Sequence, residues 1–251
     1  MFSLIPRPTI FAHRGSSAHA PENTLAAFHL AVRQGADAIE LDAKLCADGQ
    51  IVVIHDQTVD RTTQGKGRVD TLTLEELKRL DAGSCFDIAF QGESIPTLEE
   101  VFSALGHLTY INVELTNYAS LNDALPLKTA LLVRKYGLQK RVLFSSFNPL
   151  ALLKARRALP EVPIGLLALP GKQGAWARSW LGRLVPHQAL HTDLGAVTPR
   201  LVAGLKNRGK RLHVYTINST EEMKRLFSMG ADGVFTDDPV LARQALMIPD
   251  R

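Results

Sequence analysis

The stretch DAIELD, residues 37–42, alternates apolar and acidic side chains as a β-strand with two different faces would. Because successive side chains of a strand point to opposite faces, Glu40 and Asp42 share one face. Ile39 and Leu41 take the opposite face, and such an apolar face belongs against a layer of helices. The stretch therefore predicts a strand between covering helices on one side and an acidic interior on the other.

The rest of the chain alternates short β-branched runs with amphipathic helical patterns. Further strands are expected at 9–13, 51–55, 109–115, 141–145, 163–168, 188–192, 211–216 and 233–236. Helices are expected at 24–34, 74–80, 98–106, 122–136, 149–158, 198–208, 220–229 and 239–247. Strands that alternate with helices favour a parallel α/β sheet. About eight such units in 251 residues fit a closed (β/α)8 TIM barrel better than an open doubly wound sheet.

One region interrupts this alternation. More than fifty residues separate His55 from Tyr110, where a single helix would suffice to connect two strands. We predict that residues 56–108 form a small insertion after strand 2, with at least one short helix, inside a single domain that spans residues 1–251.

The composition, 45% hydrophobic and 22% charged, is that of a globular chain. No apolar run approaches the roughly 18 residues of a membrane span. Pro6 and Pro8 interrupt the region where an export signal needs an apolar core. Cys46 and Cys85 have no metal-binding spacing, so we expect reduced thiols in a cytoplasmic protein.

Positive charge is concentrated in one part of the chain. The net charge is +4, and residues 162–211 hold eight Lys or Arg against the single acid Asp193. Most of this charge is expected to be a solvated face, and attraction of an anionic substrate or lipid is the alternative.

Acidic side chains recur at the ends of the first predicted strands. In TYINVEL, residues 109–115, Glu114 shares a face with Asn112, so that Glu40, Asp42 and Glu114 all project into the predicted barrel near its mouth. Like charges at short range raise one another's pKa, and a divalent cation relieves this repulsion. Ligands that are all oxygen select Mg²⁺ or Ca²⁺. Three separate salt-bridge partners are the alternative interpretation.

Histidine and arginine also stand at predicted strand ends. His13 and Arg14 follow the first strand, and His55 ends the run at 51–55. One imidazole can accept a proton while the other donates one, and a guanidinium suits phosphate oxygens. Together with a cation, this set matches the needs of phosphodiester cleavage. Asn23 or Thr24 is expected only to cap the helix that follows.

A possible wall for the site comes from positions near other strand ends. Phe147, Tyr215 and the loop 169–187 are candidates for a substrate pocket. Within that loop, Trp176 and Trp180 start an apolar stripe at helical spacing. It is expected to pack over the barrel rim, with an interfacial lipid-binding helix as the alternative.

Several motifs carry a family resemblance. AHRGSSAHAPENTLAAF (12–28), GADAIELDAKLCADGQIVVIHDQTVDRTTQGKGRV (35–69), VELT (113–116), VYTIN (214–218) and GADGVFTDDP (230–239) occur in this order. The chain resembles the glycerophosphodiester phosphodiesterase family over nearly its whole length. The resemblance implies a TIM barrel, and a metal-dependent hydrolase that releases sn-glycerol 3-phosphate and an alcohol from small-molecule glycerophosphodiesters.

Carried over by residue, the resemblance makes His13 and His55 the acid/base pair and Arg14 a phosphate contact. It makes Glu40, Asp42 and Glu114 the ligands of one Mg²⁺ or Ca²⁺. In the mechanism we expect, the glycerol 2-hydroxyl attacks phosphorus, the two histidines exchange protons with it and with the departing alcohol, and water opens a cyclic 1,2-phosphate. The order in which the histidines act stays open.

Two departures from the family pattern bear on substrate preference. Many relatives have Glu-x-Lys where this chain has Glu114-Leu115-Thr116, and Trp-Thr where it has Tyr215-Thr216. The alternatives are lysophospholipase D-like activity on lipids and a non-catalytic barrel that binds phosphate or metal. We expect no nucleic-acid partner and no stable membrane insertion. Weak contact with a membrane surface and the choice between monomer and homodimer stay open.

Overall fold

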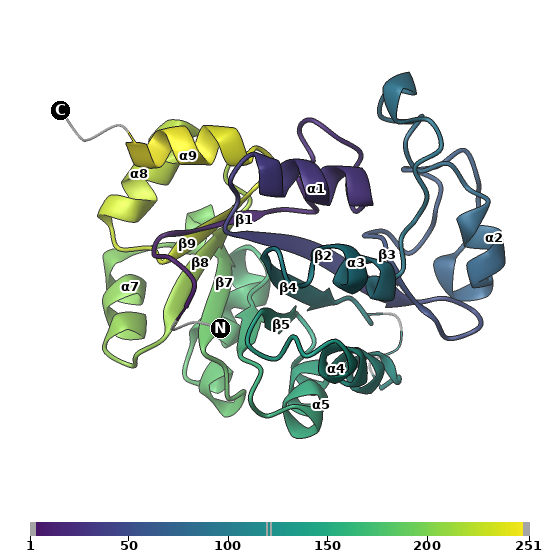
Figure 1. The fold of residues 1–251 in the computed structure, drawn as a ribbon. Coiled ribbons are helices and arrows are strands. Elements are labelled where there is room, and N and C mark those ends of the chain that lie inside the picture. The colour runs from purple at the N-terminus through teal and green to yellow at the C-terminus, as the bar shows by residue number, and fades with distance from the viewer. Residues whose placement is uncertain (1–3, 119, 121, 248–251) are drawn as a thin grey trace.

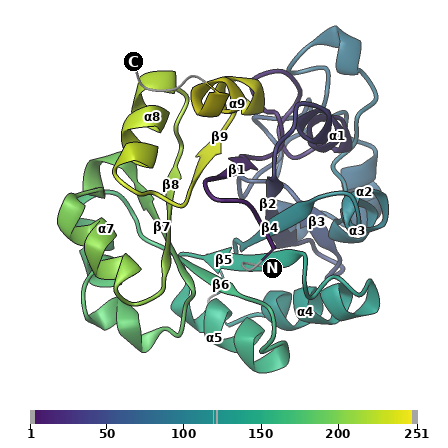
Figure 2. The same ribbon diagram turned by 60° about the vertical axis from the view of Figure 1, so that its left-hand side comes forward.

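The computed structural model describes residues 4–118, 120 and 122–247. In this part of the chain, eight parallel strands close into a barrel in the order β1-β2-β4-β5-β6-β7-β8-β9, and β9 pairs with β1 (Figure 1, Figure 2). Their bounds are β1 (Thr9–Ala12), β2 (Ala38–Leu45), β4 (Tyr110–Leu115), β5 (Val142–Ser146), β6 (Ile164–Leu167), β7 (Ala189–Asp193), β8 (Arg211–Tyr215) and β9 (Gly233–Thr236). The (β/α)8 barrel predicted from the sequence is confirmed.

Helices surround this barrel. The longer ones are α1 (Leu25–Arg33), α3 (Leu98–Leu105), α4 (Leu125–Lys135), α5 (Pro149–Ala158), α7 (Pro199–Lys206), α8 (Thr220–Ser228) and α9 (Pro239–Met247), and α2 (Leu74–Lys78) and α6 (Ala175–Arg178) are short. Single 3-10 turns lie at Val69–Thr71, Ile88–Phe90, Gly171–Gly174, Leu181–Leu184 and Leu194–Ala196. Ile39 and Leu41 are fully buried in one cluster with Phe28 of α1 and Phe102 of α3. The apolar face of DAIELD therefore lies against helices, as its alternation predicted.

The ninth strand, β3 (Ile51–Val53), corrects one expectation. It is antiparallel to β2 and lies outside the closed barrel, whereas the sequence pattern favoured an all-parallel sheet. The chain reverses at Gly49, whose φ of 73° is a left-handed conformation that glycine adopts without steric cost. Because β2 extends beyond the barrel and β3 runs back along it, the chain returns to the barrel mouth just before His55.

The residues after β3 pack with Cys46 and Val52 into a small core of their own. It consists of Cys46, Val52, Ile54, Val59, Val69, Leu77, Ala82 and Ile95, with part of α2 against it. Helix α3 also falls within the range 56–108 predicted as an insertion, but its apolar side chains are buried in the barrel's outer core. The range 56–108 therefore divides into residues that pack in this small core and helix α3, which packs against the barrel.

Aromatic and aliphatic side chains close the barrel interior below its mouth. Phe11, Leu143 and Phe235 form a buried cluster with Ala38 and Ile5. The rings of Phe11 and Phe235 stack with centroids 4.6 Å apart. We call these five residues the barrel floor. Because they fill the interior, polar side chains nearer the strand ends face a cavity that is open only at the mouth.

The apolar stripe predicted to start at Trp176 and Trp180 is not one continuous helix. α6 ends at Arg178, and a separate 3-10 turn spans Leu181–Leu184. Trp176 packs against the barrel's outer core, whereas Trp180 is 65% exposed. The expected packing over the rim is therefore right for Trp176 and wrong for Trp180.

Across the described residues, every helix is too short or too polar to cross a lipid bilayer.

Candidate active site

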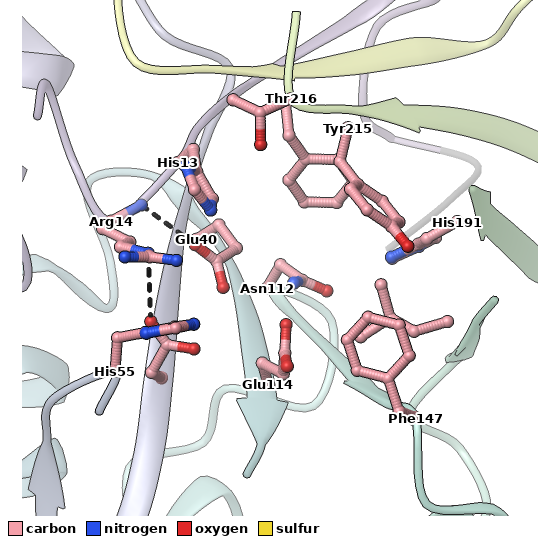
Figure 3. A pocket seen from close by; sticks show the side chains of 13 residues that line it. His13, Arg14, Glu40, His55, Asn112, Glu114, Phe147, His191, Tyr215 and Thr216 are labelled. Carbon is pink, nitrogen blue, oxygen red and sulfur yellow. Dashed lines mark hydrogen bonds and ion pairs between the residues drawn. The ribbon is translucent and has the colours of Figure 1, made fainter. Parts of the chain in front are cut away.

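A cavity of about 190 Å³ lies at the carboxyl ends of the barrel strands (Figure 3). Its lining consists of His13, Arg14, Glu40, Asp42, His55, Asn112, Glu114, Phe147, Leu167, His191, Tyr215, Thr216 and Phe235. The predicted catalytic, phosphate-binding and metal-binding residues are among them, as are Phe147 and Tyr215. The loop 169–187, which was also expected to form part of the pocket wall, contributes none of the lining residues. The lining residues come from segments far apart in the chain, and barrel closure brings them together.

Glu40, Asp42 and Glu114 form an acidic cluster in this cavity. Glu40 and Asp42 are each 2% exposed, and one oxygen from each of the three carboxylates lies within 4.8 Å of the others. Burial first, and then the neighbouring carboxylates, raise the pKa of Glu40 well above its usual range. The same causes raise the pKa of Glu114 to about 8. An all-oxygen donor set whose ionisation is resisted by burial fits a hard divalent cation, which these residues could hold.

Each carboxylate of the cluster is held by a hydrogen-bond donor. The backbone N–H of Arg14 donates to Glu40 Oε2 at 2.9 Å, and Asn23 Nδ2 donates to Asp42 Oδ2 at 2.9 Å. The Tyr118 hydroxyl donates to Glu114 Oε1 at 2.7 Å. These donors orient the oxygens before any ligand binds, and the sequence analysis missed the roles of Asn23 and Tyr118.

The PENT segment does more than begin a helix. Thr24 is the N-cap of α1, and its hydroxyl accepts the N–H of Ala27, as expected. Asn23, however, is buried with a φ of 58° and binds Asp42, and Glu22 binds both Arg14 and Arg61. The expectation that this segment only caps a helix is therefore wrong. Asparagine tolerates the left-handed conformation better than most residues, which explains its presence at this turn.

His13 is held by an aspartate from the other end of the chain. Its Nδ1 lies 2.7 Å from Asp237 Oδ1, and Asp237 also accepts hydrogen bonds from Ser17 and Asn218. Burial would raise the pKa of Asp237, but the hydrogen bonds led by that from His13 lower it to about 2. An ionised carboxylate only accepts, so His13 Nδ1 carries the proton and Nε2 remains for proton transfer.

His55 has a matching partner. Its Nδ1 lies 2.7 Å from Asp56 Oδ1, and Arg61 Nε donates to Asp56 Oδ2 at 2.7 Å. The hydrogen bond from Arg61 is the largest cause that lowers the pKa of Asp56 to about 2. Asp56 is therefore also ionised, and it fixes the same tautomer in His55 as Asp237 does in His13.

A chain of charges joins the two histidine segments. Arg61 binds Glu22 through both terminal nitrogens, at 2.7 and 2.8 Å, and Arg14 Nη1 binds the same carboxylate at 2.9 Å. Arg14 Nε also lies 3.5 Å from Asp42 Oδ2. Arg14 thus places positive charge beside the acidic cluster, and its contact with a phosphate stays a prediction.

Lys44 stands where the sequence analysis noted a missing positive charge. It follows Asp42 on the same face of β2, and its Nζ donates to Thr116 Oγ1 at 2.9 Å. Burial lowers the pKa of Lys44, and the carboxylates of Asp42 and Glu114 oppose that shift. Lys44 thus places a positive charge beside position 116 from a neighbouring strand, but it lines an adjacent cavity and not the one that holds the acidic cluster.

Phe147 and Tyr215 line one side of this cavity, and their contact with substrate stays a prediction. Their rings meet edge to face with centroids 6.2 Å apart, and Tyr118 packs against Phe147 in the same manner at 5.9 Å. The Tyr215 hydroxyl donates to the carbonyl oxygen of Ala168, which anchors the ring to the loop after β6.

Comparison with known proteins gives consistent matches. A model of the glycerophosphoryl diester phosphodiesterase family matches residues 13–241. The chain is 42% identical over 231 residues to a glycerophosphodiester phosphodiesterase of Caldanaerobacter subterraneus, covering 92% of this chain and 94% of the relative. It is 34% identical over 234 residues to one of Bacillus altitudinis, covering 92% and 94%.

Solved structures agree. A phosphodiesterase of Oleispira antarctica in complex with the product sn-glycerol 3-phosphate has a TM-score of 0.88 and 34% identity, over 98% of both chains. A glycerophosphodiester phosphodiesterase of Agrobacterium tumefaciens has a TM-score of 0.82 and 30% identity, over 94% of this chain and 99% of that one.

The acidic cluster predicts an unusual dependence of stability on pH. The pKa of Glu114 is higher in the folded state than in the unfolded state. The protonated side chain therefore adds to the free energy of unfolding, fully below the ordinary glutamate pKa, and this stabilisation is lost as pH rises through about 8. In EDTA, we expect the free energy of unfolding of the wild type to fall relative to that of Glu114→Gln over this range, because buried histidines with a lowered pKa, such as His191, act equally in both proteins. At pH 8 the variant should be more stable by roughly 1–3 kcal/mol, the usual cost of an uncompensated buried group.

Thermal unfolding with and without Mg²⁺ or Ca²⁺ checks this expectation. A cation should restore the stability of the wild type at pH 8 and leave Glu114→Gln unaffected. Glu161→Gln, at an exposed position, is the control and should behave as wild type. A difference in the free energy of unfolding between wild type and Glu114→Gln that stays constant in EDTA between about pH 5 and 8 would contradict the assignment.

Proposed function

The chain belongs to the glycerophosphoryl diester phosphodiesterase family, and on that basis we propose that it hydrolyses glycerophosphodiesters to sn-glycerol 3-phosphate and an alcohol. The observation that carries this proposal is the content of one cavity: an acidic cluster beside His13 and His55, each held by an ionised aspartate. The Oleispira antarctica neighbour, bound to sn-glycerol 3-phosphate, supports the identity of the product.

We propose that Glu40, Asp42 and Glu114 hold one divalent cation, Mg²⁺ or Ca²⁺. When bound, such a cation supplies positive charge to the phosphate and lowers the pKa of a hydroxyl that it binds. The protein's own cations add to this charge: Arg14 lies on one side of the cluster, and Lys44 lies beside Thr116.

The two histidines move the protons. In the proposed reaction, Nε2 of one histidine takes the proton from the glycerol 2-hydroxyl as this oxygen attacks phosphorus. Nε2 of the other histidine protonates the oxygen of the departing alcohol. Water then opens the cyclic 1,2-phosphate with the roles of the histidines reversed. Asp56 and Asp237 hold each imidazole in the tautomer that leaves Nε2 for this exchange.

Further features support an enzyme rather than a non-catalytic barrel that binds phosphate or metal. A barrel that only binds an anion does not need two imidazoles of fixed tautomer beside an acidic cluster. We also propose that Phe147 and Tyr215 contact the substrate's alcohol group, since both line the same cavity. The free thiols Cys46 and Cys85 support a reducing compartment such as the cytoplasm.

An assay of glycerol 3-phosphate release from water-soluble glycerophosphodiesters tests the proposal. We expect turnover with Mg²⁺ or Ca²⁺, and none in EDTA. His13→Ala and His55→Ala should each lower kcat by about 10²- to 10⁴-fold, the usual contribution of a general acid or base. His19→Ala, at an exposed histidine that pairs with Asp238, is the control and should keep wild-type turnover. More than about a tenth of the wild-type rate in either alanine variant would refute the two-histidine scheme.

The aspartate partners have their own test. Asp237→Asn keeps the shape of the side chain but removes the anionic acceptor that fixes the tautomer of His13. We expect kcat to fall by about 10²-fold, at the lower end of an acid/base contribution, with little change in KM. Asp238→Asn is the matched control, since Asp238 caps α9 and lies outside the cavity lining. Equal kcat in Asp237→Asn and wild type would show that this pairing is only structural.

A further inference from the structure

Two buried polar side chains in the cavity have no part in the reaction as described. Asn112 lies on β4, two residues before Glu114 on the same face, and His191 lies on β7. Both line the cavity, and they are 1% and 0% exposed. In Figure 3 they point toward one another from opposite sides of the barrel interior.

Only one of the two polar atoms of the Asn112 carboxamide has a hydrogen-bond partner among the described residues. Its Nδ2 donates to Ser145 Oγ at 2.9 Å. Its Oδ1 is buried, and the residues that the structure describes provide no hydrogen-bond donor to it. Buried amide oxygens are nearly always paired, so an unpaired one that faces a cavity indicates a ligand that donates there.

The imidazole of His191 likewise has one nitrogen in contact with a neighbour and one without a hydrogen-bond partner among the described residues. Its Nε2 lies 3.2 Å from His213 Nδ1, whereas its Nδ1 has no hydrogen-bond partner among the described residues. Burial, the largest cause, lowers the pKa of His191 to about 3, so the ring is neutral. A Cβ atom added to Gly165 on β6 would lie 2.4 Å from His191 Nε2. The ring therefore occupies a space that exists only because residue 165 has no side chain.

The chemistry of these two atoms selects a neutral hydroxyl. The amide oxygen accepts a hydrogen bond, and His191 Nδ1 accepts or donates according to the tautomer shared with His213. A hydroxyl donates one proton and accepts through its lone pairs, so one hydroxyl satisfies both atoms when His191 Nδ1 carries the proton and His213 Nδ1 donates to His191 Nε2. Neither group carries charge, which distinguishes this place from the cation and phosphate positions around Glu114 and Arg14.

We propose that Asn112 and His191 bind the terminal hydroxyl of the glycerol group, the one that neither esterifies phosphate nor attacks phosphorus. This inference rests on the proposed function and assigns to two residues the recognition of the glycerol group of its substrate. Asn112 and His191 are then specificity-determining residues, and they hold the glycerol group in place while the 2-hydroxyl attacks.

Packing around this subsite excludes an acylated substrate. The Phe235 ring lies against His191 with centroids 5.0 Å apart, and Phe11 stacks on Phe235 at 4.6 Å. The barrel floor therefore closes the space beyond the subsite. An acyl chain on the terminal oxygen would have to continue into this closed floor, whereas a free hydroxyl ends in front of it.

Three substrates with the same leaving alcohol test the inference in the wild-type enzyme. They are glycerophosphocholine, its analogue made from propane-1,2-diol, which lacks the terminal hydroxyl, and a short-chain 1-acyl lysophosphatidylcholine below its micelle concentration. We expect kcat/KM to fall by about 10- to 100-fold for the diol analogue, because it leaves buried polar atoms unpaired. The 1-acyl lipid should be hydrolysed no faster than the diol analogue.

The outcomes separate the two proposals. Hydrolysis of glycerophosphocholine and the diol analogue at equal kcat/KM would overturn the subsite and leave the proposed function standing. Hydrolysis of the 1-acyl lipid as fast as glycerophosphocholine would do the same. Failure to hydrolyse any glycerophosphodiester would refute the proposed function, and the inference with it.

Variants test whether Asn112 and His191 cause the preference for glycerophosphocholine over the diol analogue. Asn112→Leu and His191→Phe should bring the ratio of kcat/KM between glycerophosphocholine and the diol analogue close to one. A purely structural defect would lower both values and preserve their ratio. His187→Phe is the matched control: this buried histidine contacts Lys210 outside the cavity lining, so the wild-type ratio should persist. If both cavity variants kept the wild-type ratio of kcat/KM between the two substrates, the assignment of Asn112 and His191 would be overturned. The comparison of substrates in the wild-type enzyme does not depend on how any variant folds.

Discussion

The repulsion among three buried carboxylates is the constraint on which the rest of this site depends. Glu40, Asp42 and Glu114 project from two adjacent strands into one small cavity, and burial together with their mutual proximity resists their ionisation. A fold keeps such a cluster only if the free energy that it costs is offset by something that uses it. A divalent cation offsets it directly, and the protein's own donors and cations offset part of it in advance.

The surrounding network follows from that need. Arg14 bonds Glu40 through its backbone and lies beside Asp42 through its side chain, so one residue serves two carboxylates. Glu22 then ties Arg14 to Arg61, which holds the partner of His55. The acidic cluster and His55 therefore belong to one hydrogen-bonded unit, and His13 is held separately by Asp237. The orientation of this unit is set before substrate arrives, as efficient catalysis by fixed charges requires.

Much of the fold and the candidate site could be predicted, because the signals are local. The alternation in DAIELD states which side chains share a face, and Thr97 with Glu100 forms the capping box that begins α3. The direction of β3 could not be predicted, because a short apolar run reads the same in both directions and only the turn at Gly49 reverses it. The prediction of one helical stripe through Trp176 and Trp180 was wrong because the spacing of apolar residues does not reveal a break in a short helix.

The sequence by itself determined which face of each strand is acidic or apolar, and which residue types stand at the strand ends. Both are properties of a strand's own geometry, in which side chains alternate whatever lies around them. Only the tertiary structure decided the partners. His13 meets Asp237 across 224 positions of chain because β1 pairs with β9, and the unpaired atoms of Asn112 and His191 face one cavity because β4 and β7 lie in one closed barrel. Barrel closure depends on the packing of the whole chain, so no single stretch of the sequence contains it.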